Sequence, residues 1–235
     1  MPEIIPAIMP ESFKDLEIKM RQVRNLVSIV QLDVMDGIFT PPITWPYNLK
    51  EGFDFEDILK GKKDMPFLKD LEFEVDMMIN DPEEEVERWI RVGARRVVGH
   101  FEALEDPEAF IKKAKDATVP YDSPLYAEVG LAIGMETDIE DISPLVSELD
   151  FVQVMGITRI GFQGEEFQEE AVETVSLLRQ SFPELVISVD GGVNEDNAYF
   201  LTKAGADRLV SGSAVFQAED IKEAVENLRS SGGGV

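Results

Sequence analysis

The stretch Gln31-Leu32-Asp33-Val34-Met35-Asp36-Gly37 follows an apolar run at residues 26–30 and precedes a Pro-rich loop. Polar and apolar side chains alternate through it, which is typical of a β-strand whose successive side chains face opposite sides. If Leu32 and Val34 pack under helices, then Asp33 points the other way. A carboxylate in so apolar a run needs a partner, because burying an unpaired charge is costly. We interpret the stretch as a buried strand that carries Asp33 into a site. The alternative is a strand end that runs into a turn at Asp36-Gly37.

Short apolar runs of this kind recur along the chain and alternate with amphipathic stretches. The strand candidates are residues 4–9, 29–35, 73–79, 96–100, 126–133, 151–155, 186–189 and 208–210. Asp81-Pro82 and Asp106-Pro107 each offer an N-cap residue followed by a first-turn proline, and residues 168–182 and 194–203 are further helix candidates. Eight strands that alternate with helices predict parallel βα units and, in 235 residues, a (β/α)8 TIM barrel. A doubly wound open sheet is the structural alternative.

The chain contains no low-complexity linker, so we predict a single domain over residues 1–229. The Ser/Gly-rich residues 230–235 are expected to form a flexible C-terminal tail.

Acidic residues outnumber basic ones by 47 to 22, which gives a formal net charge of −25. Such a surface repels phosphate backbones and anionic lipids, so neither nucleic acid nor membrane is an expected partner. A site for a phosphorylated metabolite must then be local and built from backbone N–H groups. The absence of cysteine excludes a disulfide framework and a thiolate nucleophile. We expect a cytoplasmic protein, and the acidity suggests the hypothesis of a salty cytoplasm.

In a TIM barrel the reaction site lies at the carboxyl ends of the strands. Two glycine loops stand at such ends, at residues 190–192 and 211–213, where backbone can approach a bound oxygen closely. They predict a phosphate cradle, although glycine serves an ordinary turn equally well. The other polar strand-end residues are Asp33, Asp36, Asp76, His100, Glu128, Gln153 and Asp190.

Several motifs occur together in one order, and with them the chain resembles the ribulose-phosphate 3-epimerase family of (β/α)8 barrels from about Ile4 to Leu228. They are Leu32–Gly37, Val75–Pro82, His100 with Glu102-Ala103, Gly161–Gly164 with Phe167, Val189–Val193 and Ala204–Ser213. The resemblance implies an isomerase that epimerises a ketopentose or ketohexose phosphate through an enediolate, with Asp33 and Asp190 as acid/base groups on opposite faces of the sugar. It also implies a divalent metal held by two His and these two Asp, and a homo-oligomer.

The chain departs from the family at the metal site, where Gln31 and Asp76 replace the two His. The remaining set Gln31, Asp33, Asp76 and Asp190 offers oxygen ligands, which favour Mg²⁺, Mn²⁺ or another hard cation over Zn²⁺. Three carboxylates make the metal cluster a weaker Lewis acid than the family's, and the site could also be metal-free. In addition, Ala7 replaces a Ser, Gln163 a Gly and Glu165 a Gln.

The resemblance implies a set of residues around the phosphosugar, to which we add Arg159 as a cation in the loop after the sixth strand: Met35, Arg159, Gly161, Gly164, Gly191, Gly192, Gly212 and Ser213. Arg159 would bind the phosphate, or alternatively form a surface pair with Glu165 or Glu166. His100 is expected to be a packed, hydrogen-bonded strand-end residue, and the sequence leaves Glu128 either inside the barrel or against the helices.

Three functions compete on these residues. The first is an active phosphosugar epimerase with a hard metal or none, and the retention of both acid/base carboxylates favours it. The second is a phosphosugar-binding barrel without turnover, and the third is a related barrel enzyme with altered chemistry.

Overall fold

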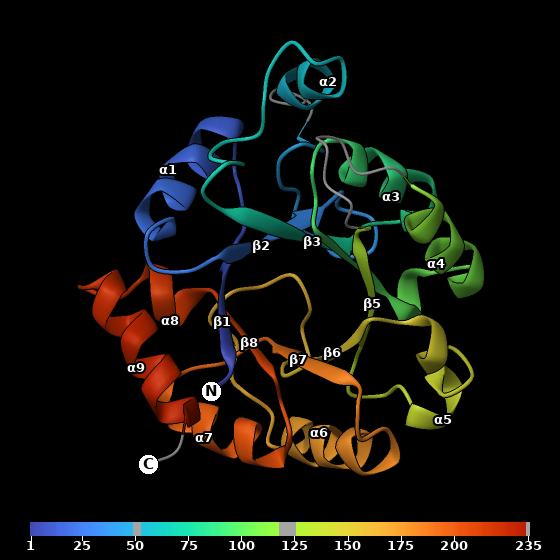
Figure 1. Ribbon diagram of the computed structural model, residues 1–235, viewed down its shortest axis with the longest axis vertical. Coiled ribbons are helices and arrows are strands. Elements are labelled where there is room, and N and C mark those ends of the chain that lie inside the picture. The colour runs from blue at the N-terminus through green and yellow to red at the C-terminus, as the bar shows by residue number, and fades with distance from the viewer. Residues whose placement is uncertain (49–52, 118–125, 234–235) are drawn as a thin grey trace.

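The computed structural model describes residues 1–48, 53–117 and 126–233. Eight parallel strands pair in sequence order and close into a barrel, which confirms the TIM barrel and excludes the open sheet (Figure 1). The strands are β1 (Glu3–Ile8), β2 (Ile29–Met35), β3 (Glu72–Met78), β4 (Arg96–His100), β5 (Glu128–Ile133), β6 (Phe151–Met155), β7 (Val186–Asp190) and β8 (Arg208–Ser211).

Helices surround the barrel and cover its outer face. They are α1 (Phe13–Val23), α2 (Phe53–Leu59), α3 (Pro82–Arg91), α4 (Pro107–Asp116), α5 (Ile139–Ile142), α6 (Glu170–Ser181), α7 (Glu195–Ala204), α8 (Ser213–Phe216) and α9 (Ile221–Gly233), with short 3₁₀ turns at Phe101–Ala103 and Val146–Glu148. Among the described residues, no helix has both the length and the apolar character that crossing a lipid bilayer would require.

Alternation along the strands separates an apolar outer layer from a polar interior. On β2, Leu32 and Val34 belong to the large apolar core that the helices cover. Gln31 and Asp33 alternate with them in sequence and therefore face the inside of the barrel. The register of β2 with β3 pairs Asp33 with Asp76, so two carboxylates are set side by side on neighbouring strands.

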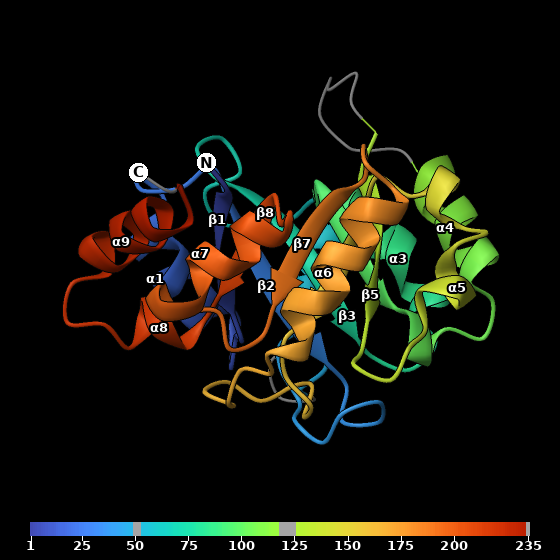
Figure 2. The same ribbon diagram turned by 90° about the horizontal axis from the view of Figure 1, so that it is seen from below.

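The loops at the carboxyl ends of the strands gather at one end of the barrel. In Figure 2 the blue loop after β2 and the gold loop after β6 lie there, opposite the end that carries both termini. The two loops touch, since a Cβ added at Gly161 would lie 2.5 Å from Thr40 Oγ1. Trp45 is fully buried and packs edge-on against Phe13 and Trp89, which fastens the first loop to the helices.

The two predicted helix caps differ in the structure. Asp106 caps α4 as expected, because its side chain accepts a hydrogen bond from Ala109 N at 3.0 Å. Asp81 makes no such bond and has a left-handed backbone, with φ of 51°. Its carboxylate accepts from the neighbouring Asn80 side chain at 2.6 Å, so Asp81 occupies the predicted N-cap position before Pro82 but does not cap α3 with its side chain.

The C-terminal tail also differs from the prediction, because α9 continues through Ser230–Gly233. Glycine is a poor helix former, which favoured a flexible tail. In the folded chain, however, a Cβ added at Gly232 would lie 2.6 Å from Pro2 Cγ and 3.1 Å from Thr202 Oγ1. Packing against these residues therefore stabilises the last turn, and residues 234–235 lie outside the described range.

Candidate active site at the carboxyl ends of the strands

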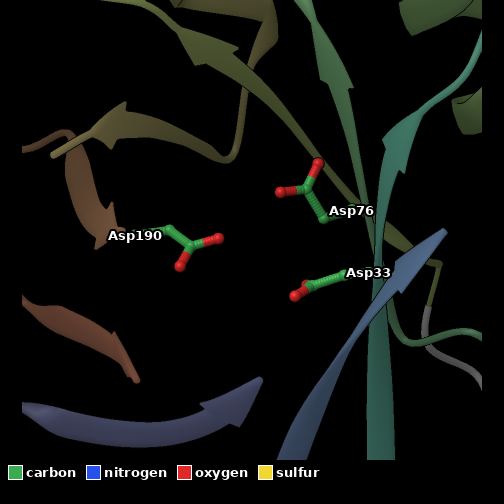
Figure 3. Close-up of side chains that lie close together, drawn as sticks. All are labelled: Asp33, Asp76 and Asp190. Carbon is green, nitrogen blue, oxygen red and sulfur yellow. The ribbon is translucent and has the colours of Figure 1, made fainter. Parts of the chain in front are cut away.

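Three aspartates converge inside the barrel near the ends of their strands. Asp33 on β2, Asp76 on β3 and Asp190 at the end of β7 point toward one another (Figure 3), with one carboxylate oxygen of each within 4.8 Å of the others. All three are buried, so their charges are poorly solvated. The structure therefore brings together the two predicted acid/base residues and one of the two residues that replace a family His.

Gln31 links the two predicted acid/base groups. Its Nε2 donates to Asp33 Oδ1 at 2.9 Å and to Asp190 Oδ2 at 2.7 Å. Its Oε1 is buried and accepts no hydrogen bond within the described part of the chain. The carboxamide thus bridges the two carboxylates through its nitrogen. Its oxygen remains available to accept a hydrogen bond or to bind a metal ion.

Asp76 is oriented by two residues from other strands. His100 Nε2 lies 2.8 Å from Asp76 Oδ1, and Gln153 Nε2 donates to Asp76 Oδ2 at 3.0 Å. His100 is fully buried at the end of β4, as expected for a packed, hydrogen-bonded residue. Its Nδ1 finds no partner among the described residues, so the Asp76 carboxylate is its sole hydrogen-bond contact there.

Burial and mutual repulsion shift the acid–base equilibria of this cluster. Burial raises the pKa of Asp33 well above its usual value, and repulsion from Asp190 and Asp76 acts in the same direction. Burial likewise raises the pKa of Asp190 to about 7, helped by repulsion from Asp76. Burial alone would lower the pKa of His100, but attraction to Asp76 outweighs it and the pKa is raised. At neutral pH the cluster therefore holds protons that isolated carboxyl groups would have lost.

The cluster also has the ligands that a divalent cation would need. Three carboxylates lie within 4.8 Å of one another, and burial and mutual repulsion raise the pKa values of Asp33 and Asp190, so a positive charge between the three would stabilise their ionised forms. The hydrogen bonds from His100 and Gln153 orient Asp76 from behind, as donors behind a metal-binding carboxylate commonly do. Asp33, Asp76 and Asp190 are thus positioned so that they could hold a metal ion.

A cavity opens beside the carboxylates at the mouth of the barrel. Asp33 and Asp190 line it, and its apolar wall consists of Met9, Met78, Met155, Ile157, Phe162 and Val193. The predicted glycine loops contribute Gly161, Gly164, Gly191, Gly192, Gly212 and Ser213, and Ala7, Gln163 and Val210 complete the wall. Every glycine and serine that the sequence assigned to phosphate binding therefore lines one cavity with the two predicted acid/base residues.

The positions of Gly191 and Gly192 tolerate only a residue without a side chain. Both have positive φ, 98° and 69°, which other residues adopt only with strain. A Cβ at Gly192 would also lie 2.9 Å from the backbone of Phe167, so the loops after β6 and β7 meet at this point. The conformation leaves the backbone at the cavity wall open to close approach by a ligand.

Two other residues of the predicted set lie away from the cavity wall. Arg159 is exposed, forms an ion pair with Glu165 at 3.2 Å and stacks on the ring of Phe162 at 4.4 Å. This is the surface pair that the sequence offered as the alternative to phosphate binding. Met35 is fully buried behind the cavity, where its sulfur lies 3.1 Å from a Cβ added at Gly161.

Glu128 lies inside the barrel, at the end opposite the carboxylate cluster. Its Oε2 accepts from Arg208 Nη2 at 2.8 Å and pairs with Arg96 Nε at 3.1 Å. Arg96 also pairs with the buried Glu74 at 3.3 Å. The structure thus decides between the two positions that the sequence left open for this residue.

Sequence reasoning missed two contributors to the site. It did not link Gln153 to Asp76, because the contact joins β6 to β3 across the barrel. It noted Gln163 as a departure from the family pattern, and that departure was the available signal for its position on the cavity wall.

Known proteins resemble the chain both in sequence and in fold. Residues 3–216 match the sequence profile described as "Ribulose-phosphate 3 epimerase family". The ribulose-phosphate 3-epimerase of Eremothecium gossypii is 30% identical over 229 residues, covering 97% of this chain and 92% of that protein. The chloroplastic ribulose-5-phosphate-3-epimerase of Arabidopsis thaliana is 32% identical over 233 residues, covering 97% and 76%. Among solved structures, 3-hexulose-6-phosphate synthase from Salmonella typhimurium matches in fold, with a TM-score of 0.69, 18% identity and 98% coverage of both chains.

Proposed function

The chain belongs to the ribulose-phosphate 3-epimerase family, and from this premise we propose that it epimerises a ketopentose phosphate at the carbon next to the ketone. The observation that carries the proposal is the pair Asp33 and Asp190, which come from β2 and β7 and are joined through the carboxamide of Gln31. Both line the same cavity as the glycine loops. A sugar held there would have one carboxyl group toward each face.

The chemistry requires one carboxylate that takes a proton and one carboxyl group that gives one. Removal of the C3 proton leaves an enediolate, whose negative charge is delocalised between C3 and the oxygen on C2. Return of a proton from the opposite face inverts C3, and the protonation states of Asp33 and Asp190 are exchanged. The raised pKa values of both groups support this role, because a strongly repelling pair retains a proton near neutral pH.

The phosphate of the substrate would occupy the part of the cavity formed by Gly191, Gly192, Gly212 and Ser213. Its negative charge would be met by backbone N–H groups, which glycine leaves accessible. The apolar wall of Met78 and Met155 would cover the sugar carbons and limit access of water to the enediolate.

A divalent cation is part of the proposal. Asp33, Asp76 and Asp190 would hold it, with Gln31 as a fourth ligand through its buried oxygen, which has no hydrogen-bond partner among the described residues. Because all these ligands are oxygens, Mg²⁺ or Mn²⁺ is favoured over Zn²⁺. Such a cation would act as a Lewis acid toward the developing enediolate charge.

The second candidate is a phosphosugar-binding barrel without turnover. Both oxygens of Asp76 already accept hydrogen bonds, and Gln31 Nε2 lies between Asp33 and Asp190. These hydrogen bonds satisfy the carboxylate oxygens without a cation. They favour a site that has lost the divalent metal expected from the family resemblance. The two candidates make the same prediction for binding and opposite predictions for proton transfer.

The test is interconversion of ribulose 5-phosphate and xylulose 5-phosphate in D₂O, followed by NMR. The epimerase should place one deuterium at C3 of the product. Asp33→Asn and Asp190→Asn should each lower turnover by about 10²–10⁴-fold, as expected for loss of a general acid or base. Binding of the sugar phosphate without deuterium incorporation would support the second candidate instead.

Metal binding can be measured separately, from the melting temperature of metal-stripped protein with and without an added divalent cation. Mg²⁺ or Mn²⁺ should raise it, since a ligand that binds only the folded state stabilises that state. Asp76→Asn should reduce the increase, whereas Asp196→Asn on the exposed first turn of α7 should leave it unchanged. An equal increase in wild type and Asp76→Asn would count against the three-carboxylate metal site.

A further inference from the structure

The cavity has few side chains that could hydrogen-bond an anion. Among the described residues, its lining consists of apolar residues, glycines, the acidic residues Asp33 and Asp190, and two other polar side chains, Gln163 and Ser213, which can donate a hydrogen bond. No Lys or Arg belongs to this lining within the part of the chain that the structure describes. A phosphate in this cavity can therefore find side-chain donors only at these two residues, unless the surroundings rearrange.

Gln163 reaches from the loop after β6 across to the ends of β8 and β1. A Cβ added at Gly212 would lie only 2.6 Å from Gln163 Nε2, so the carboxamide rests directly on this glycine. The same nitrogen donates to Ala7 O at 3.4 Å, at the long end of the range for such bonds. The carboxamide thus lies against the loop assigned to the phosphate and is held there by one weak contact.

The surroundings of Gln163 allow its side chain to reorient and donate a hydrogen bond to a bound anion. The residue is exposed, so reorienting its side chain buries no new polar group. Of the acidic residues on the same loop, Glu165 is two positions from Gln163 and is paired with Arg159 at 3.2 Å. An incoming phosphate would therefore meet a neutral donor beside a carboxylate that is already compensated.

Since a neutral donor adjoins the phosphate loops in a cavity without cations, we propose that Gln163 is a specificity-determining residue that hydrogen-bonds the phosphate of the substrate through its side-chain amide. This inference rests on the proposed function for the location of the phosphate. It assigns the role to a residue that differs from the glycine of the family pattern. The hydrogen bond from the carboxamide would stabilise the phosphate charge in part, as a Lys or Arg would do more strongly.

The test compares wild type with Gln163→Leu, which keeps the side-chain volume and removes the donor. Calorimetry should show about tenfold weaker binding of inorganic phosphate and of ribulose 5-phosphate, the loss expected for one hydrogen bond to a charged group. KM for ribulose 5-phosphate should rise by the same factor with kcat unchanged, because the contact binds substrate and transition state alike. Gln163→Asn, which retains a shorter carboxamide, should recover part of the affinity.

Gln168→Leu is the matched control, since Gln168 follows on the same loop but bonds Glu166 O and does not line the cavity. It should bind phosphate as wild type does. Unchanged melting temperatures in all variants would confirm that they are folded.

Equal or tighter binding of phosphate by Gln163→Leu would overturn the inference, and tighter binding would identify the side chain as an obstruction. Absence of phosphate binding by wild type would overturn it as well. If wild type binds ribulose 5-phosphate but incorporates no deuterium, the epimerase proposal fails, whereas a tenfold loss in Gln163→Leu would still uphold the role of Gln163.

Discussion

His100 and Asp76 form a buried pair in which each residue depends on the other. Nε2 and Oδ1 lie 2.8 Å apart, and both side chains are fully buried. Although burial alone would lower the pKa of His100, the adjacent Asp76 carboxylate raises it, which favours an imidazolium–carboxylate pair. Removal of the His would leave Asp76 with Gln153 as its hydrogen-bond donor among the described residues.

We therefore predict that His100→Ala lowers the free energy of unfolding by about 3–5 kcal/mol, the cost of leaving one partner of a buried ion pair uncompensated. Urea denaturation in metal-free buffer would measure it. The double variant His100→Ala/Asp76→Asn, which removes the charge as well, should recover part of this loss. If the double variant is no more stable than His100→Ala, the charge of Asp76 is not the cause.

That Asp33 and Asp190 lie together at the site was predictable from the sequence, but their connections to other residues were not. Asp33 and Asp190 were identified by the family resemblance at strand ends, where a barrel collects its site. The contacts from His100 and Gln153 to Asp76 depend on which side chains from distant strands meet after closure. The same holds for Gln31, whose replacement of a His was visible although its bridge to Asp190 was not.

On β5, Gly130 provides space for a ring from the neighbouring strand. A Cβ at this position would lie 2.5 Å from the ring of Phe151, which β6 contributes to the barrel interior. We predict that Gly130→Ala destabilises the fold by about 1–3 kcal/mol through overpacking. Thermal and urea denaturation would measure this change.

Phe151→Leu should relieve the overlap, so Gly130→Ala should lower the free energy of unfolding less in the Phe151→Leu background than in wild type. This double variant is compared with Phe151→Leu alone, since the smaller side chain has a cost of its own. Strict additivity of the two changes would contradict the packing explanation, because residues in contact are expected to couple.

Glu74 on β3 belongs to the charged layer at the other end of the barrel. Burial raises its pKa from 4.5 to about 7, although Arg96 and Arg208 lower it. The folded chain thus holds this proton more tightly than the unfolded chain does. Between pH 4.5 and about 7 the unfolded state loses the proton first, so stability falls as pH rises through this window.

Glu74→Gln cannot titrate and should remove this part of the pH dependence. We expect the stability of wild type relative to Glu74→Gln to fall by about 3 kcal/mol across the window, as follows from the size of the shift. Urea denaturation of both proteins at several pH values would measure it. The control is Glu72→Gln, an exposed position on the same strand. Parallel pH profiles for wild type and Glu74→Gln would refute the prediction.

Strand positions were predictable to within one or two residues because each strand is a short apolar run between turn residues. For β2, β4 and β6 the predicted and observed limits coincide. Helix ends were less predictable: Asp106 and Asp81 both precede a proline, yet only Asp106 forms a side-chain cap. The difference is the left-handed backbone at Asp81, which no local residue pattern specifies.

Across the whole molecule, 47 acidic residues against 22 basic ones leave a formal charge of −25. The structure contains surface ion pairs such as Arg21–Glu17 and Lys62–Asp57, but pairing cannot neutralise so large an excess. Isolated pairs of this kind contribute little to stability. Self-repulsion should therefore destabilise the compact state at low ionic strength.

We predict that the melting temperature of metal-free protein rises by at least about 3 °C between low salt and about 1 M KCl, corresponding to roughly 1 kcal/mol for a chain of this size. Salt screens repulsion between exposed charges, and at about 1 M the screening length is only about 3 Å. Differential scanning calorimetry would measure the shift. A variant with several exposed Glu of α3 and α6 changed to Gln should respond less, because it has less repulsion to screen. A melting temperature that stays constant or falls with KCl would show that the excess acidity does not limit stability, and would remove the support for adaptation to a salty cytoplasm.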